Sequence, residues 1–169
     1  MLTGLGPLVA PATRLLVLGS FPGVASLKAQ QYYEHPQNHF WPIVFTIFKV
    51  ESAVSPSIDC HSSYQIRTDW LLAHGVGLWD VYASCKREGS LDSQIRQAQV
   101  NDLSSLRQRC PALQAIAHNG GESFKHARQT QALGLPVYKL PSTSPANASW
   151  RFERKLAAWR EVFQLHGLV

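Results

Sequence analysis

The sequence is poor in the residues that build metal clusters, disulfide frameworks and membrane spans. Its 169 residues include only three cysteines, which stand far apart at positions 60, 85 and 110 and form no CxxC pair. This spacing argues against a zinc site, an iron–sulfur cluster and a disulfide framework. We therefore predict no bound metal and a reducing, cytoplasmic setting.

Long apolar runs and nucleotide-binding loops are also missing. The most apolar run, Phe40–Phe48, is too short to span a bilayer and contains Pro42 and Thr46. The first residues carry no charged start before an apolar stretch, so we expect no signal peptide. Because neither a GxGxxG turn nor a Walker loop occurs, we expect no cofactor, and we expect no membrane partner.

Basic residues outnumber acidic ones, and part of the excess is concentrated near the C-terminus. The formal net charge is +5, which suits a polyanionic partner but also occurs in many other proteins. The last stretch holds four basic residues against two acidic ones, namely Arg151, Arg154, Lys155 and Arg160 against Glu153 and Glu161. This cluster predicts either a solvated helix face or a contact with a phosphate backbone.

Short apolar runs alternate with segments of helical spacing. The runs that predict buried strands are Arg14–Gly19, Val76–Tyr82, Leu113–His118 and Pro136–Leu140. The segments that predict helices are Phe40–Val50, Thr68–His74, Asn101–Arg109, Glu122–Leu133 and Ser149–Gln164, with Asn101 and Ser149 as N-caps. The alternation predicts one α/β domain over residues 1–169, a three-layer sandwich around a mainly parallel four-stranded sheet. We expect it to act as a monomer.

Ligands of such sheets bind beyond the carboxyl ends of the strands, so the residues that follow each strand are the candidates for function. Asp80 and Asn119 end two of the predicted strands and are both expected to face a pocket. Each has a plainer interpretation, because aspartate also caps turns and helices and asparagine before two glycines is typical of a turn.

Three further segments stand where a site would be built. GSFPG follows the first predicted strand, and its two glycines allow a tight turn. HPQNHFW places Asn38 just before a helix, where an N-cap is the simplest interpretation, and Phe40 would then belong to the core. LPSTSPANAS offers small hydroxyl side chains and backbone N–H groups that suit phosphate, although a loop with a helix cap explains it equally well.

In this order, from Leu15 to about Leu165, these segments resemble the uracil-DNA glycosylase superfamily. GSFPG is similar to the family's water-activating motif, which reads GINPG in the mismatch-specific enzymes. HPQNHFW resembles the segment that follows that motif. PSTSPANAS resembles the loop that enters the DNA minor groove.

One departure narrows the resemblance. Phe21 stands where the mismatch-specific enzymes have the asparagine that positions the attacking water, and phenylalanine cannot do that. The hypoxanthine-DNA glycosylase branch also has GSFP-type first motifs, and its catalytic asparagine lies in the HPQN segment. The resemblance therefore implies that Asn38 is catalytic and that the substrate is double-stranded DNA containing hypoxanthine.

The resemblance also implies roles for the other candidates. Phe21 or Phe40 would stack on the flipped base, and Asp80 and Asn119 would bind it. The residues expected to contact DNA are Ser142, Ser144, Pro145, Ala146, Asn147, Arg151 and Arg154. Two rival interpretations remain at this point: a uracil glycosylase, and a non-catalytic DNA-binding module on the same fold.

Overall fold

A computed structural model describes residues 1–49, 58–59 and 61–169. Val50, at the end of one predicted helix, and Cys60 lie outside the described residues. All remaining sequence predictions fall within them.

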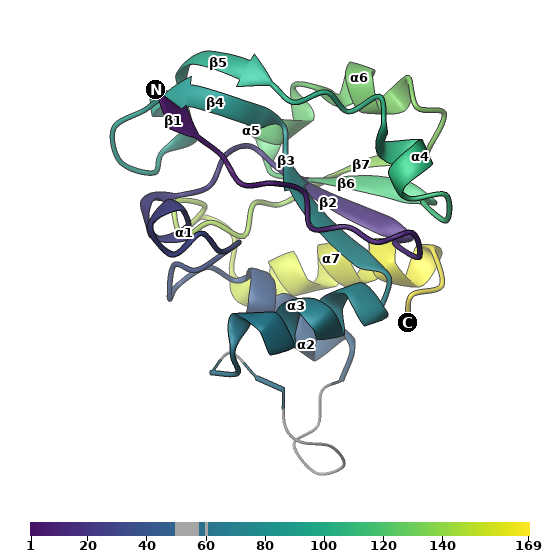
Figure 1. Ribbon diagram of the computed structural model, residues 1–169. Helices are drawn as coiled ribbons and strands as arrows, with labels where there is room; N and C mark the ends of the chain where they lie inside the picture. Colours follow the sequence, from purple (N-terminus) through teal and green to yellow (C-terminus); the bar gives the residue numbers. More distant parts are fainter. Residues whose placement is uncertain (50–57, 60) are drawn as a thin grey trace.

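A parallel four-stranded sheet forms the centre of the protein (Figure 1). Its strands are β2 (Leu15–Gly19), β3 (Val76–Asp80), β6 (Ala115–Asn119) and β7 (Val137–Leu140), arranged in the order β3-β2-β6-β7. Every residue of β2, β3 and β6 is buried, which explains why these strands are continuous apolar runs rather than alternating ones. The predicted fold class and strand set are confirmed.

Helices cover both faces of this sheet. Alternate residues of the strand β2 point to opposite faces and pack against the helices on each side. Leu15 and Val17 of β2 pack into a core with the helices drawn below the sheet in Figure 1. Leu16 and Leu18 pack into a second core on the other face. The first layer contains α2 (Phe40–Ile47), α3 (Tyr64–Ala73) and α7 (Phe152–Leu165); the second contains α4 (Leu106–Arg109), α5 (Gly121–Phe124) and α6 (Ala127–Gln131).

A small antiparallel sheet extends the second layer and was not predicted. It consists of β1 (Leu2–Thr3), β4 (Tyr82–Lys86) and β5 (Arg96–Val100), in the order β1-β4-β5. The predicted strand Val76–Tyr82 is therefore too long: β3 ends at Asp80 and the chain turns into the other sheet at Val81. Asp80 is thus the last residue of β3, at the carboxyl edge of the central sheet.

Several predicted helices have different bounds. Asn101 does not begin a helix, because its amide donates to the Asp80 carbonyl at 2.8 Å, and α4 begins only at Leu106. Ser149 is not an N-cap either, since α7 begins at Phe152 after Arg151. The predicted helix Glu122–Leu133 is divided into α5 and α6.

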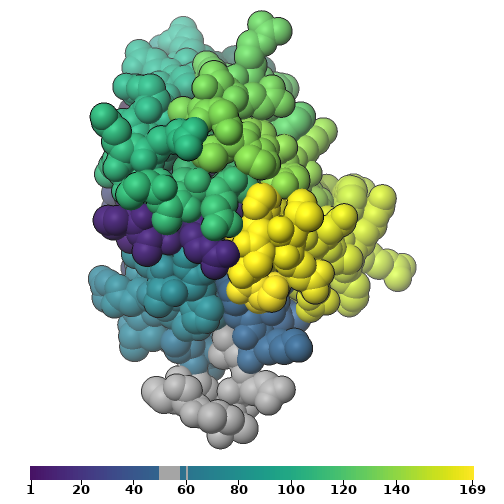
Figure 2. Space-filling view, turned by 90° about the vertical axis from the view of Figure 1, so that its right-hand side faces the viewer, coloured from purple at the N-terminus to yellow at the C-terminus, as the bar shows by residue number. Residues whose placement is uncertain are grey.

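Two short elements near the first strand were also missed. They are α1 (Val24–Ala29), which follows the GSFPG turn, and a 3-10 turn at Asp92–Gln94. At the opposite end of the sheet, the end of the chain packs beside the start of β2, where Arg14 Nη2 donates to the His166 carbonyl at 2.8 Å (Figure 2). The site described next lies at the carboxyl ends of the strands.

Candidate active site

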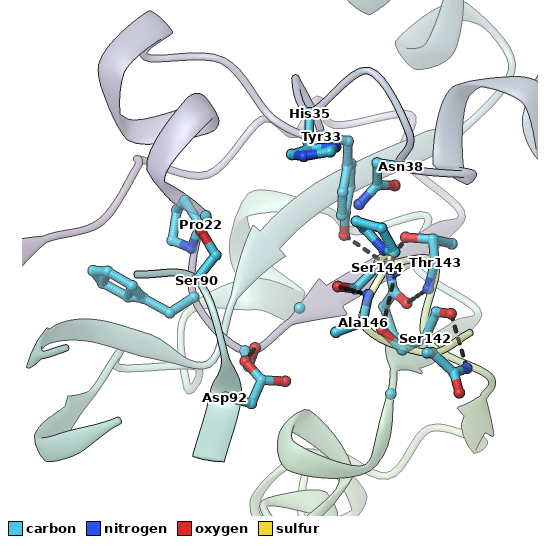
Figure 3. A pocket seen from close by; sticks show the side chains of 18 of the residues that line it. Pro22, Tyr33, His35, Asn38, Ser90, Asp92, Ser142, Thr143, Ser144 and Ala146 are labelled. Carbon is cyan, nitrogen blue, oxygen red and sulfur yellow. Dashed lines mark hydrogen bonds between the residues drawn. The ribbon is translucent and has the colours of Figure 1, made fainter. Parts of the chain in front are cut away.

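A cavity of about 680 Å³ opens at the carboxyl edge of the central sheet. Its walls come from four chain segments, as Figure 3 shows: residues 19–26 and 90–93 on one side, residues 32–38 above, and the loop 139–147 opposite. The predicted site residues that line it are Phe21, Asn38, Asp80, Asn119, Ser142, Ser144, Pro145, Ala146 and Asn147. Strand ends and loops far apart in the sequence therefore meet at one place, as the parallel topology requires.

Asp80 lies at the floor of the cavity with only 4% of its surface exposed. Its Oδ2 atom is buried and has no hydrogen-bond partner among the described residues. Burial raises the pKa of this carboxyl from 3.8 to about 7, with a smaller contribution from the negative charge of Asp92 and an opposing one from Arg87. A buried acceptor without a donor is costly, so an N–H group of a ligand would find a vacant partner here.

Gly19 allows Asp80 to occupy this position. The two residues are paired across β2 and β3. A Cβ atom at position 19 would collide with the Asp80 carboxylate and lie 3.4 Å from the Tyr33 hydroxyl. The glycine that ends the first strand is thus required by close approach to a side chain.

Tyr33 forms part of the wall above Asp80, and sequence reasoning missed it. Its ring stacks on Phe40, with centroids 4.3 Å apart and planes at 28°. Its backbone is in the left-handed region, at φ 59°, which is uncommon for a residue other than glycine and is often seen at functional sites. Burial and the nearby Asp80 raise the pKa of the Tyr33 hydroxyl, so it stays a protonated hydrogen-bonding group.

Asn119 ties the cavity walls together. Its Nδ2 atom donates to the Tyr33 hydroxyl at 3.2 Å and to Thr143 Oγ1 at 3.0 Å, and its Oδ1 atom accepts from the Thr143 backbone N–H at 3.0 Å. Both amide hydrogens are therefore already used. This geometry favours a role for Asn119 in positioning Tyr33 and the loop at Thr143. Asn119 is therefore more than the turn residue that its place before two glycines indicated.

Asn38 lies on the cavity wall, just before the N-terminus of α2. Its Oδ1 atom accepts the backbone N–H of Phe40, the first residue of α2, at 2.9 Å. The N-cap of α2 is His39, which makes no side-chain cap bond, so the N-cap interpretation of Asn38 is wrong and its bond to Phe40 belongs to a turn that precedes the helix. The amide group nevertheless lines the cavity beside Tyr33 and His35, as Figure 3 shows, and the carbonyl oxygen keeps a second lone pair.

The two phenylalanines predicted to face a base differ in position. Phe21 lines the cavity with 7% of its surface exposed, and the Arg87 guanidinium lies 5.2 Å from its ring centroid. Phe40 is fully buried and does not line the cavity. The expectation that Phe40 stacks on a base is therefore corrected: its ring packs behind Tyr33 and against Trp41 and Trp159.

The loop before β5 forms the wall opposite residues 142–147. Ser20 Oγ donates to Asp92 Oδ1 at 2.7 Å, and Ser90 Oγ accepts the backbone N–H of Val24 at 2.9 Å. These bonds hold the loop against the GSFPG turn. Asp92 thereby becomes a second carboxylate at the cavity, one that sequence reasoning missed because no periodic pattern marks its segment.

The loop after β7 is ordered by its own side chains. Ser142 Oγ accepts the Ser144 N–H at 3.2 Å, and Asn147 Nδ2 donates to the Ser142 carbonyl at 3.1 Å. Gly120, at φ 99°, lets this loop approach, because a Cβ atom there would lie 3.0 Å from Ser142 Cβ. Ala146 is exposed at the tip of the loop, next to the mouth of the cavity.

The basic residues of the C-terminal helix divide into exposed and buried groups. Arg151 and Arg154 are exposed, and the Arg154 guanidinium lies 3.7 Å from the Trp150 ring centroid. Lys155 is only 1% exposed and points the other way, with its Nζ 3.3 Å from His39 Nδ1 and 3.5 Å from the Ser144 carbonyl. Lys155 therefore joins α7 to the loop and to the residue that follows Asn38.

Neither a metal group nor a membrane helix is found in the part of the chain that is described. Among those residues, no three histidine, cysteine, aspartate or glutamate side chains come together in a group that could hold an ion. None of the described helices combines the length and apolar character that crossing a bilayer requires.

Known proteins resemble this chain over nearly its whole length. Two curated relatives are named hypoxanthine DNA glycosylase: one from Methanosarcina barkeri is 35% identical over 95% of this chain and 97% of its own, and one from Methanosarcina acetivorans is 34% identical over 90% and 91%. The solution NMR structure of a candidate uracil DNA glycosylase from Methanosarcina acetivorans superimposes with a TM-score of 0.82, at 31% identity and 97% coverage of both chains. The family model for the uracil DNA glycosylase superfamily matches residues 7–163. The chain belongs to the uracil DNA glycosylase superfamily.

Proposed function

We propose that this protein is a DNA glycosylase that removes hypoxanthine from deaminated DNA by hydrolysing the N-glycosidic bond. The observation that carries the proposal is a cavity of about 680 Å³ at the carboxyl edge of the sheet, large enough to admit a nucleoside, lined by Asn38 and Asp80 and bordered by the loop 142–147. The names of the two Methanosarcina relatives support hypoxanthine as the base. The whole chain, residues 1–169, would act as one domain and as a monomer on double-stranded DNA.

A glycosylase must first turn the nucleotide out of the duplex, because its glycosidic bond cannot be reached inside the stack. The loop residues Ser144–Asn147 would hold the opened duplex, and Ser142, Arg151 and Arg154 would contact phosphates. Unstacking costs a few kcal/mol, and the cost is least for a poorly paired base, so weak pairing of hypoxanthine contributes to its selection.

Within the cavity, Asp80 is the group that reads the base. Hypoxanthine presents an N1–H donor, which matches the buried and unpartnered Oδ2 of Asp80. Adenine presents a bare N1 acceptor at the same point, which would repel the Asp80 carboxylate once it is ionised, above a pH of about 7. Tyr33, supported from behind by Phe40, and Phe21 are the aromatic surfaces available for stacking.

Asn38 acts on the sugar side of the bond. Bond cleavage leaves positive charge on the sugar and negative charge on the departing base. An amide does not titrate, so Asn38 would orient a water molecule with its second carbonyl lone pair and stabilise the cationic sugar electrostatically. Buried free thiols at Cys85 and Cys110 agree with action in the reducing cytoplasm.

The proposal is tested with matched duplexes that contain one hypoxanthine, one uracil or neither. After incubation, alkali cleaves the strand wherever a base has been released, and a gel separates the products. We expect cleavage of the hypoxanthine duplex at a higher single-turnover rate than of the uracil duplex. Preference for uracil would refute the proposed base, and binding without release from any duplex would make the protein a non-catalytic module.

A further inference from the structure

The proposed reaction needs a proton acceptor that Asn38 cannot supply. The attacking water must lose a proton as its oxygen bonds to the sugar, and an amide is not basic enough to take it. The Asn38 carbonyl is in addition already bonded to the Phe40 N–H at 2.9 Å. A second group at the cavity is therefore required for efficient hydrolysis at neutral pH.

Two carboxylates are found among the described residues that line the cavity, Asp80 and Asp92. Asp80 is buried at the floor, where the base would lie. Asp92 lies on the opposite wall from the loop 142–147, as Figure 3 shows, and remains accessible to solvent. An acidic side chain in a cleft that binds DNA opposes the phosphate charge, and this cost suggests that it has a task in the cleft.

The orientation of Asp92 is fixed by its neighbours. Ser20 Oγ donates to its Oδ1 atom at 2.7 Å, and the bond from the Val24 N–H to Ser90 Oγ at 2.9 Å holds the loop in place. The other oxygen, Oδ2, has no hydrogen-bond partner among the described residues and is free to bind water in the cavity. A side chain held in one direction with one open oxygen has the arrangement that proton abstraction needs.

We infer that Asp92 is the general base of the glycosylase reaction, which makes it a second catalytic residue beside Asn38. The inference rests on the proposed function. The water oxygen bonds to the sugar C1′ while the C1′–N9 bond breaks, and the electron pair of that bond leaves with the base. The proton of the water passes to Asp92, which later releases it to solvent, and the departing purine takes up a proton.

Charged groups of both signs surround Asp92, and its pKa is raised above the ordinary value of 3.8. The groups that act on it are Asp80 from β3, Arg87 after β4, Glu122 in α5 and Lys125 just after that helix. Partial burial raises the pKa of Asp92, while the Ser20 hydrogen bond, Arg87 and Lys125 lower it. Asp80 is more deeply buried, and its pKa is raised to about 7.

The decisive variant is Asp92→Asn, because an asparagine oxygen still accepts the Ser20 hydroxyl but cannot take a proton. We expect its single-turnover rate on a hypoxanthine duplex to fall by a factor of about 10² to 10⁴. Its melting temperature should not change, and its affinity for the duplex should stay the same or increase. The part of the acid limb of the pH–rate profile that arises from Asp92 should disappear, whereas the part near pH 7 that arises from Asp80 should remain. Asp102→Asn is the matched control, since Asp102 is exposed, bonds to Ser104 and does not line the cavity.

Ser20→Ala provides a second, independent readout. Loss of the Ser20 hydrogen bond removes an interaction that favours ionised Asp92, so the acid limb should move to higher pH. A folded Asp92→Asn protein with the wild-type rate and acid limb would overturn the inference, and so would an unmoved limb in Ser20→Ala if Asp92→Asn failed to fold. A wild-type protein that releases no base refutes the proposed function as well, which distinguishes the two failures.

Discussion

At the scale of single residues, Asn38 has a structural bond and a place on the cavity wall, and substitution can separate the two. Asn38→Ala removes the side-chain hydrogen bond to the Phe40 N–H and should lower the free energy of unfolding by about 0.5–1.5 kcal/mol. Asn38→Ser restores an oxygen that can accept this N–H in a turn, but not the amide. We expect both variants to lose base release in single-turnover assays, while thermal unfolding shows that only the alanine variant is destabilised.

Duplex affinity serves as the control for both Asn38 variants and should stay near the wild-type value. If the serine variant regained excision together with stability, the only role of Asn38 would be the turn bond to Phe40.

Asp80 should make the stability of the protein depend on pH. Its folded-state pKa of about 7 lies above the ordinary value of 3.8, so the folded protein holds this proton more tightly than the unfolded chain does. The contribution of Asp80 is therefore fully present at low pH and is lost as pH rises from about 4 through about 7. A shift of this size corresponds to a loss of up to about 4 kcal/mol.

Asp80→Asn removes this ionisation, so above pH 7 it should melt at a higher temperature than the wild type. The gap should close toward pH 4. Asp102→Asn, at an exposed position, should keep the wild-type slope between these values. Parallel melting curves for wild type and Asp80→Asn across this range would mean that Asp80 is not desolvated.

Gly19 and Gly6 offer a matched pair of glycine substitutions. A Cβ atom at Gly19 would meet the Asp80 carboxylate, whereas a Cβ atom at Gly6 would meet nothing within 4 Å. Gly19→Ala should therefore lower stability by about 1–3 kcal/mol through overpacking and should reduce excision by displacing Asp80. Gly6→Ala should leave both unchanged. Denaturant unfolding and single-turnover rates measure the two effects, and equal behaviour of the pair would contradict the close approach at Gly19.

At the scale of residues, the sequence predicted which side chains stand at the strand ends, but not which other side chains they meet in the folded protein. Asp80 and Asn119 could be placed at the cavity because the carboxyl ends of buried strands converge. Tyr33 and Asp92 could not, since each depends on a contact across long stretches of chain, to Asn119 in one case and to Ser20 in the other. Phe40 was expected at a base, but its ring is fully buried behind Tyr33.

At the scale of elements, the spacing of apolar residues predicted those helices and strands that bury a continuous face. The buried strands β2, β3 and β6 and the long helix α7 were found, because apolar runs and the regular spacing of core residues identify them. The small sheet was missed because its strand β5 is exposed at every residue and shows no alternation. Caps at Asn101 and Ser149 were wrong because both amino acids also bond within loops.

The start of α7 is where an element meets DNA in the proposed complex. Arg151 and Arg154 are exposed there, next to the loop 142–147, whereas Arg160 lies further along the same helix. Charge reversal at Arg151 and Arg154 should weaken binding to all duplexes alike. It should also flatten the dependence of log affinity on log salt by about one unit per lost phosphate contact.

Fluorescence titrations of labelled duplexes at several salt concentrations measure this effect. Arg160→Glu is the control for a change of charge on the same helix and should alter the slope less. If the Arg151 and Arg154 reversals gave the same salt slope as Arg160→Glu, the basic cluster would be a solvated face.

At the scale of the whole molecule, the topology explains how a small chain builds this site. The strand order β3-β2-β6-β7 brings Asp80, Gly19, Asn119 and Leu140 to one edge, since each ends its strand. The two helical layers bury alternate faces of β2 and keep that edge fixed. The family and the sheet could be predicted from sequence because both depend on local motifs and apolar runs, whereas the second carboxylate at the cavity depends on the folded arrangement.

Base excision by this protein should not depend on a bound metal, because the residues of the cavity can supply the required chemistry together. In the proposed mechanism Asn38 would orient the water, Asp92 would accept its proton and Asp80 would bind the base, so hydrolysis would need no Lewis acid. Excision of hypoxanthine should therefore proceed at an unchanged single-turnover rate after dialysis against EDTA and in its presence. The control is the same preparation with added zinc or magnesium, measured at equal ionic strength because salt alone weakens DNA binding. Activity that is lost in the chelator and returns with one metal would contradict this mechanism and would require an ion in the cavity.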